Sequence, residues 1–169
     1  MADLIINKCY SYKIMIVSSE EIDQREVKKI TMNELEEIKM AEIIKELKPS
    51  SIYIDAVDIN EARFRKKILK LIDYSPEEVI SKHKADDLFP IVSAASIIAK
   101  DKRDSIIEEM KEKFGDFGSG YPSDRKTIGF LRDWMKKNKN IPPFARKSWD
   151  TTKKLFNEEV VNRKISDYL

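Results

Sequence analysis

Apolar residues recur along the chain at two spacings, one typical of strands and the other typical of helices. Residues 12–18, YKIMIVS, form a short run rich in β-branched residues and are predicted to be a strand. Residues 51–55 alternate, so that Ile52 and Ile54 face one side of a second strand while Asp55 faces the other.

A third strand candidate covers residues 79–81, and helical patterns separate and follow the strands. Thr31 and Glu34 have the spacing of a capping box, ahead of apolar positions that recur at helical intervals to Leu47. We predict further helices over residues 60–71, 88–114, 124–137 and 148–161. The first of these is predicted to bury Phe64, Ile68 and Leu71. Pro90 fits only the first turn of the longest.

The predicted elements run strand, helix, strand, helix, strand and then helices only. This order predicts an α/β sheet domain over residues 1–115 and a helical lobe over residues 116–169. Cys9 is the one cysteine and His83 the one histidine, which excludes an internal disulfide and a metal site built from several cysteines or histidines. The four glycines cannot form the common glycine-rich loops that bind dinucleotides or phosphates.

The apolar runs are too short to cross a bilayer, because Pro90, Ser93 and Ser96 interrupt the longest one. The amino terminus has neither the basic start nor the small-residue cleavage site of a secretory signal. We therefore expect a soluble, cytoplasmic protein.

Charge is distributed unevenly along the chain. Residues 1–80 carry 13 Lys and Arg against 16 Asp and Glu, whereas residues 120–164 carry 12 against 5. A basic carboxyl-terminal surface suits a polyanion such as nucleic acid. On charge alone, a solvated lysine-rich helix face is the better interpretation.

Aspartates at a strand end and at a helix start are the candidate catalytic residues. Asp55 lies opposite the apolar face of its strand, where an active-site acid and an exposed capping residue are both reasonable interpretations. Asp86 and Asp87 precede the helix near Leu88, where the helix dipole alone favours acids. One of them suffices as a cap, so the other could face a metal ion. A carboxylate site without histidines would select Mg²⁺ or Mn²⁺.

Two segments near the carboxyl end are candidates for contacts with nucleic acid. The loop Gly118–Asp124 holds Tyr121, which either lies at the surface and contacts a sugar or base, or packs inward beside a helix cap. Residues 146–149, RKSW, combine two cations, a hydroxyl and an aromatic ring, as a phosphate-binding cluster would. Trp149 itself is predicted to anchor the last helix.

Together these segments resemble ribonuclease HII, the type 2 ribonuclease H family, and most closely its archaeal branch. The matching segments are residues 53–58 (YIDAVD), 83–100 (HKADDLFPIVSAASIIAK) with Arg103 and Asp104, 118–124 (GSGYPSD) and 145–149 (ARKSW). They occur in the order and spacing of the family.

The resemblance implies a ribonuclease-H-like mixed sheet with flanking helices and a helical lobe that binds the substrate. It implies an endonuclease that hydrolyses the RNA strand of RNA/DNA hybrids and cuts at ribonucleotides embedded in duplex DNA. Four carboxylates in the family hold two divalent ions, Mg²⁺ or Mn²⁺.

Single positions follow from the motif match. Asp55 and Asp86 match two of the catalytic metal ligands. Tyr121 matches the tyrosine that senses the junction between RNA and DNA. Lys84, Arg146 and Lys147 fall where the phosphates of the nucleic acid would lie.

The sequence departs from the family at its start. The family begins with a strand that carries an Asp-Glu pair followed by Ala-Gly-Arg-Gly, and this sequence contains no Asp-Glu dipeptide. The first strands and two metal ligands are therefore expected to be missing. Three hypotheses follow: a truncated monomeric enzyme that is inactive alone, a paralogue that binds nucleic acid without cutting it, and half of a two-chain enzyme.

Overall fold

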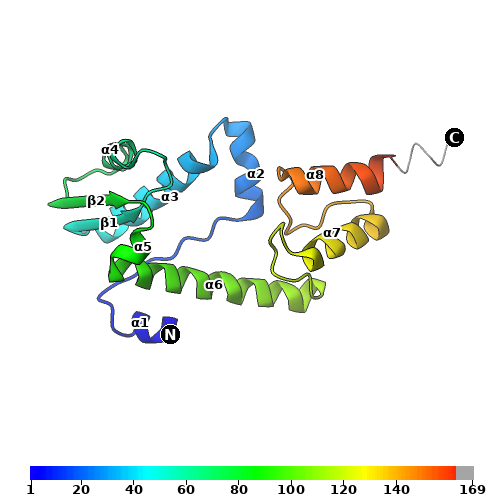
Figure 1. Ribbon diagram of the computed structural model, residues 1–169, viewed down its shortest axis with the longest axis horizontal. Coiled ribbons are helices and arrows are strands. Elements are labelled where there is room, and N and C mark those ends of the chain that lie inside the picture. The colour runs from blue at the N-terminus through cyan, green and yellow to red at the C-terminus, as the bar shows by residue number, and fades with distance from the viewer. Residues whose placement is uncertain (163–169) are drawn as a thin grey trace. The chain divides into compact units, whose positions relative to one another are not determined.

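The computed structural model describes residues 1–162, which form two compact units (Figure 1). Among these residues, the first unit consists of residues 1–16 and 30–103, and the second of residues 17–29 and 104–162. The longest helix, α6 (Pro90–Phe114), contributes to both units. The boundary predicted between residues 115 and 116 remains a prediction. Within residues 1–162, no helix combines the length and the apolar character needed to cross a membrane.

The first unit is built on a pair of parallel strands, β1 (Ser51–Asp55) and β2 (Glu78–Lys82). The register sets Ile52 against Val79 and Asp55 against Lys82. Parallel strands need a crossover connection, and here it is helix α4 (Glu61–Leu71). Helix α3 (Met32–Leu47) packs against α4, and the pair lies beside the strands in Figure 1. Two short helices complete this unit, α1 (Ala2–Ile6) and α5 (Ala85–Leu88).

The core of the first unit comes from the inward faces of β1 and β2 and from the apolar stripes of α3 and α4. Its buried members are Ile44, Ile52, Ile54, Phe64, Ile68 and Val79. Phe64 and Ile68 are fully buried because they lie four residues apart, on one face of α4. Burying a side chain of this size stabilises the fold by about 1.5–3 kcal/mol. These residues therefore form the core on which the two strands pack.

The second unit is helical. Its helices are α2 (Ser19–Lys28), the last part of α6, α7 (Arg125–Asn138) and α8 (Asp150–Phe156), which continues into a π-helical turn (Asn157–Val161). Helices α7 and α8 pack together around Leu131, Met135, Leu155 and Val160, and lie side by side in Figure 1. The rings of Phe114, Phe117, Phe130, Trp134 and Phe144 form an aromatic cluster, in which Phe117 with Phe144 and Phe130 with Trp134 are stacked and the other pairs are tilted or edge-to-face.

Most predicted elements are present, and the α/β class with a helical carboxyl-terminal part is confirmed. The capping box of Thr31 and Glu34 forms as predicted, and Pro90 opens α6. The strand predicted over residues 12–18 is wrong, because within residues 1–162 the sheet has only two strands and neither pairs with this segment. Leu71 is 38% exposed, since it lies at the end of α4 beyond the core.

Buried charges in the first unit form one ion-pair network. Asp58 follows β1 and accepts hydrogen bonds from Arg63 Nε at 2.8 Å and from the N–H of Asn60 at 2.9 Å. Lys67 Nζ lies 2.8 Å from Glu37 Oε1 and 3.8 Å from Asp58 Oδ2. Buried carboxylates are tolerated only when they are paired in this way. The network fixes the turn between β1 and α4.

The Asp58 network predicts a specific acid sensitivity. Hydrogen bonds from Arg63 lower the pKa of Asp58 from 3.8 to about 2. Because the folded-state pKa is depressed, the stabilisation is complete above pH 3.8 and is lost as the pH falls from there to about 2. Asp58→Asn should therefore reduce stability at neutral pH and flatten the pH dependence in that window. The readout is the urea concentration at which native NMR cross-peaks of Ile52 and Phe64 disappear.

Asp73→Asn is the matched control, since Asp73 is an exposed aspartate of the same unit. It should leave both the neutral-pH midpoint and its acid dependence unchanged. Equal behaviour of the two variants would contradict a role for the network.

Candidate active site and nucleic-acid interface

Asp55 lies where the ends of the two parallel strands bring distant parts of the chain together. It is the last residue of β1, opposite Lys82 of β2, and its side chain is exposed. Its Oδ1 accepts a hydrogen bond from the N–H of Ala85 at 3.3 Å. Ala85 is fully buried and begins α5, and Asp86 is the next residue. The fold therefore brings the Asp55 carboxylate to the main chain directly before Asp86.

The conformation of Lys84 and a hydrogen bond from Ser93 define the main chain around Asp86. Lys84 adopts a left-handed conformation with φ of +53°, which turns the chain from β2 into α5. Ser93, in the first turn of α6, donates its hydroxyl to the main-chain carbonyl of Asp86. Asp86 is half-buried, whereas Asp87 is exposed. The structure thus distinguishes two adjacent aspartates that the sequence pattern could not.

The two aspartates fit a divalent metal ion as part of its ligand set. Carboxylate oxygens are the donors that Mg²⁺ and Mn²⁺ prefer. Apart from the bond to Ala85, neither side chain makes a hydrogen bond or ion pair with the residues that the structure describes. Over residues 1–162, however, no group of three or more His, Cys, Asp or Glu is arranged to hold a metal ion. Asp55 and Asp86 can therefore supply only some of the ligands.

His83 has structural contacts in this region. Its Nε2 lies 3.1 Å from the carbonyl oxygen of Ile59, and its main-chain N–H donates to Glu61 Oε1 at 2.9 Å. Lys82 Nζ also contacts Glu61, at 3.1 Å. These bonds tie the end of β2 to the start of α4. Lys84, the predicted phosphate contact in this unit, is exposed.

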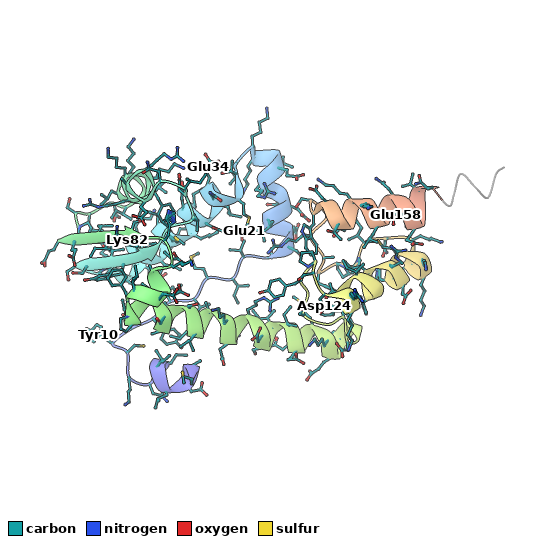
Figure 2. The ribbon with its side chains drawn as sticks, viewed as in Figure 1. Tyr10, Glu21, Glu34, Lys82, Asp124 and Glu158 are labelled. Carbon is teal, nitrogen blue, oxygen red and sulfur yellow. The ribbon has the colours of Figure 1, made fainter. Side chains whose placement is uncertain are left out.

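In the second unit, the loop that carries Tyr121 is built around Asp124. The Asp124 carboxylate, labelled in Figure 2, accepts hydrogen bonds from the N–H of Ser119 at 2.7 Å and its hydroxyl at 2.8 Å. It also caps α7 by accepting from the N–H of Lys126 at 2.9 Å. Led by the main-chain bond from Ser119, these bonds hold the pKa of Asp124 far below its usual value.

A second set of hydrogen bonds closes the same loop. The hydroxyl of the buried Thr127 accepts from the N–H of Gly120 at 3.0 Å and donates to the carbonyl of Phe117 at 2.8 Å. Gly118 and Gly120 both have positive φ, +78° and +77°, which glycine adopts without strain. Tyr121 is 52% exposed on this braced loop. The sequence left open whether Tyr121 lies at the surface or packs inward, and in the structure it lies at the surface.

Arg146 and Lys147 lie side by side in the sequence and are both exposed, in the segment that leads into α8. Trp149 is half-buried and stands at the amino-terminal end of that helix. Lys84 belongs to the first unit, whereas Tyr121, Arg146 and Lys147 belong to the second. No pattern in the sequence singles out Asp23 of α2, whose carboxylate contacts Lys147 and Ser148 more than 120 positions away.

Comparison with known proteins relates this chain to one family. The family model described as "Ribonuclease HII" matches residues 2–152. Ribonuclease HII of Pyrococcus furiosus is 48% identical over 157 residues, which cover 92% of this chain and 67% of the relative. Ribonuclease HII of Methanococcoides burtonii is 48% identical over 144 residues, or 82% of this chain and 67% of that relative.

Solved structures agree with the sequence relatives. The crystal structure of ribonuclease H2 from Pyrococcus horikoshii matches with a TM-score of 0.87 and 40% identity, over 93% of this chain and 74% of that chain. The structure of the PCNA:RNase HII complex from Archaeoglobus fulgidus matches with a TM-score of 0.81 and 40% identity, over 91% and 72%.

The bracing of the Tyr121 loop predicts opposite effects at two glycines. A Cβ at Gly118 would collide with the Asp124 carboxylate, and the positive φ adds strain, so Gly118→Ala should destabilise the second unit by about 1–3 kcal/mol. Gly129 is helical with open space around it, so Gly129→Ala should stabilise the unit by about 0.5–1 kcal/mol. Urea unfolding followed by tryptophan fluorescence reports this unit, because both tryptophans, Trp134 and Trp149, lie in it.

A neutral Gly118→Ala variant would show that the loop tolerates a side chain there. In that case the hydrogen bonds of Asp124 would not determine the conformation of the loop.

Proposed function

We propose that this chain, which belongs to the ribonuclease HII family, uses Asp55 and Asp86 as ligands of divalent metal ions and Tyr121 as its contact to ribose. The family consists of hydrolytic endonucleases that act on RNA paired with DNA and depend on divalent ions. The observation that carries the proposal is the hydrogen bond from Ala85 to Asp55, which joins two segments of the matched region next to Asp86.

The metal ions bound there are Mg²⁺ or Mn²⁺ in this proposal, because the donors are carboxylates. Divalent ions at such a site activate water and stabilise the oxygen that leaves phosphorus. In this proposal, Asp55 and Asp86 present two carboxylates to the metal ions at a fixed separation. The hydrogen bonds from Ala85 and Ser93 support this role, since they restrict the carboxylate of Asp55 and the main chain of Asp86.

Recognition of the substrate is divided between ribose and phosphate contacts. The Tyr121 hydroxyl can bond a 2′-hydroxyl, the group that distinguishes RNA from DNA. Lys84, Arg146 and Lys147 are exposed cations, and they would contact phosphates and position the duplex. Cutting at a single ribonucleotide within duplex DNA is part of this proposal, since one tyrosine needs only one 2′-hydroxyl.

A second function is favoured by one observation, the absence of a third ligand beside Asp55 and Asp86 in residues 1–162. A site with two carboxylates would leave divalent ions incompletely coordinated. The chain would then bind hybrid duplexes without cutting them, even when another polypeptide supplies further carboxylates.

A cleavage assay separates these functions. We expect the 169-residue chain with Mg²⁺ or Mn²⁺ to leave duplex DNA with one ribonucleotide intact. It should cut this DNA when an amino-terminal segment with the Asp-Glu pair of the family is fused to it or added as a separate chain. Asp55→Asn and Asp86→Asn should each then reduce cleavage by about a hundredfold or more, because each removes a ligand charge.

Asp87→Asn is the matched control and should retain cleavage, since Asp87 is exposed and outside the proposed ligand set. Robust cleavage by the chain alone would show that other residues complete the metal site. Failure of the supplemented chain, in spite of duplex binding, would favour the non-cutting function.

Tyr121→Phe tests the ribose contact. The loss of one hydroxyl should weaken binding to duplex DNA with one ribonucleotide by about three- to tenfold, and should leave binding to the same duplex without it unchanged. Fluorescence anisotropy with the two labelled duplexes measures both. An equal effect on the two would make Tyr121 a residue of the loop structure.

A further inference from the structure

Asp23 makes a concentrated set of hydrogen bonds to the segment that carries Arg146 and Lys147. Its Oδ2 accepts from the N–H of Lys147 at 2.9 Å. Its Oδ1 accepts from the N–H of Ser148 at 2.8 Å and from the Ser148 hydroxyl at 2.6 Å. One carboxylate thus binds three donors on two consecutive residues, and fixes the main chain there more tightly than a single bond could.

The helix that presents Asp23 is itself anchored in the second unit. Ile22, the preceding residue, is buried, and Glu26 one turn later lies 3.4 Å from Lys153 of α8. Burial alone would raise the pKa of Asp23, but the bonds from Ser148 and Lys147 outweigh it and hold this pKa below its usual value. Asp23 is therefore a charged acceptor at neutral pH.

The side chains on the fixed segment remain available. Arg146 and Lys147 are exposed, and neither side chain makes a hydrogen bond or ion pair with the described residues. The main chain of this segment is bonded, while its two cationic groups face solvent. A carboxylate this close to a phosphate-binding segment lowers the local positive potential, which by itself would weaken the attraction of nucleic acid.

We propose that Asp23 is a positioning residue, which holds the main chain of residues 147–148 so that Arg146 and Lys147 meet the phosphates of an RNA/DNA duplex at fixed places. This role rests on the proposed function, because it requires Arg146 and Lys147 to contact phosphates. Electrostatic attraction alone predicts that removal of a negative charge beside a basic segment strengthens the binding of a polyanion. The proposed role of Asp23 predicts the opposite, that its removal weakens this binding.

The test is the binding of a fluorescein-labelled RNA/DNA hybrid duplex to the full chain, without divalent ions so that no cleavage intervenes. We expect Asp23→Ala to bind about tenfold more weakly at ~0.1 M salt, with a slope of log affinity against log salt that is smaller by about 1–2. Glu20→Ala is the control, since Glu20 is an exposed acid in the first turn of the same helix. It should bind as well as the unaltered chain or slightly more tightly.

A double-mutant comparison separates positioning from general stability. In a chain that already carries Arg146→Ala and Lys147→Ala, the further change Asp23→Ala should alter affinity by less than about twofold. A loss of the same size in both backgrounds would overturn the proposal. Binding by Asp23→Ala equal to or tighter than that of Glu20→Ala would also overturn it.

Ser148→Ala keeps the test decisive if Asp23→Ala fails to fold. It removes one of the three donors and should weaken binding in the same direction but less, so unchanged binding overturns the proposal. Two outcomes would contradict the proposed phosphate contacts, and the role of Asp23 with them. One is that the unaltered chain does not bind the hybrid, and the other is that the variant carrying both Arg146→Ala and Lys147→Ala binds it as tightly as the unaltered chain does. A failure confined to Asp23 and Ser148 leaves the proposed function standing.

Discussion

Hydrogen bonds from main-chain N–H groups to aspartate carboxylates hold several of the segments on which the candidate functional residues lie. Asp55 binds the main chain before Asp86, Asp124 binds the loop of Tyr121, and Asp23 binds the segment of Arg146 and Lys147. A carboxylate can accept several such bonds at once, and bonds to a charged acceptor are stronger than neutral ones. The Tyr121 loop and the segment of Arg146 and Lys147, which lie outside the helices, are thereby held in defined conformations.

This way of bracing loops suits a protein that must bind a highly charged ligand. The cations that would meet phosphates are left exposed, while the anions that hold the main chain are occupied by their own hydrogen bonds. Asp124 and Asp23 both have lowered pKa values for this reason. The two kinds of charge therefore serve different purposes within one unit.

The first unit contains carboxylates of two kinds, because the proposed metal ligands must remain able to bind a cation whereas the others are paired with Arg and Lys. Asp58 and Glu37 are buried and neutralised by Arg63 and Lys67, whereas Asp55 keeps an exposed side chain at the strand end. Only an exposed carboxylate such as that of Asp55 can bind a metal ion in place of its contacts with water. Burial and pairing, rather than residue type, separate structural from candidate catalytic aspartates here.

The sequence by itself determined the local elements and the family. The alternation of residues 51–55, the capping box at Thr31 and the Gly118–Asp124 loop follow from rules that act over a few residues, and each is present in the structure. The strand predicted over residues 12–18 is wrong because strand formation is not decided locally: a strand exists only when another strand pairs with it. Tertiary structure alone decided that Asp86 rather than Asp87 is half-buried, that Tyr121 is exposed, and that Asp23 meets Ser148. These outcomes depend on contacts between residues far apart in the chain, which no local spacing encodes.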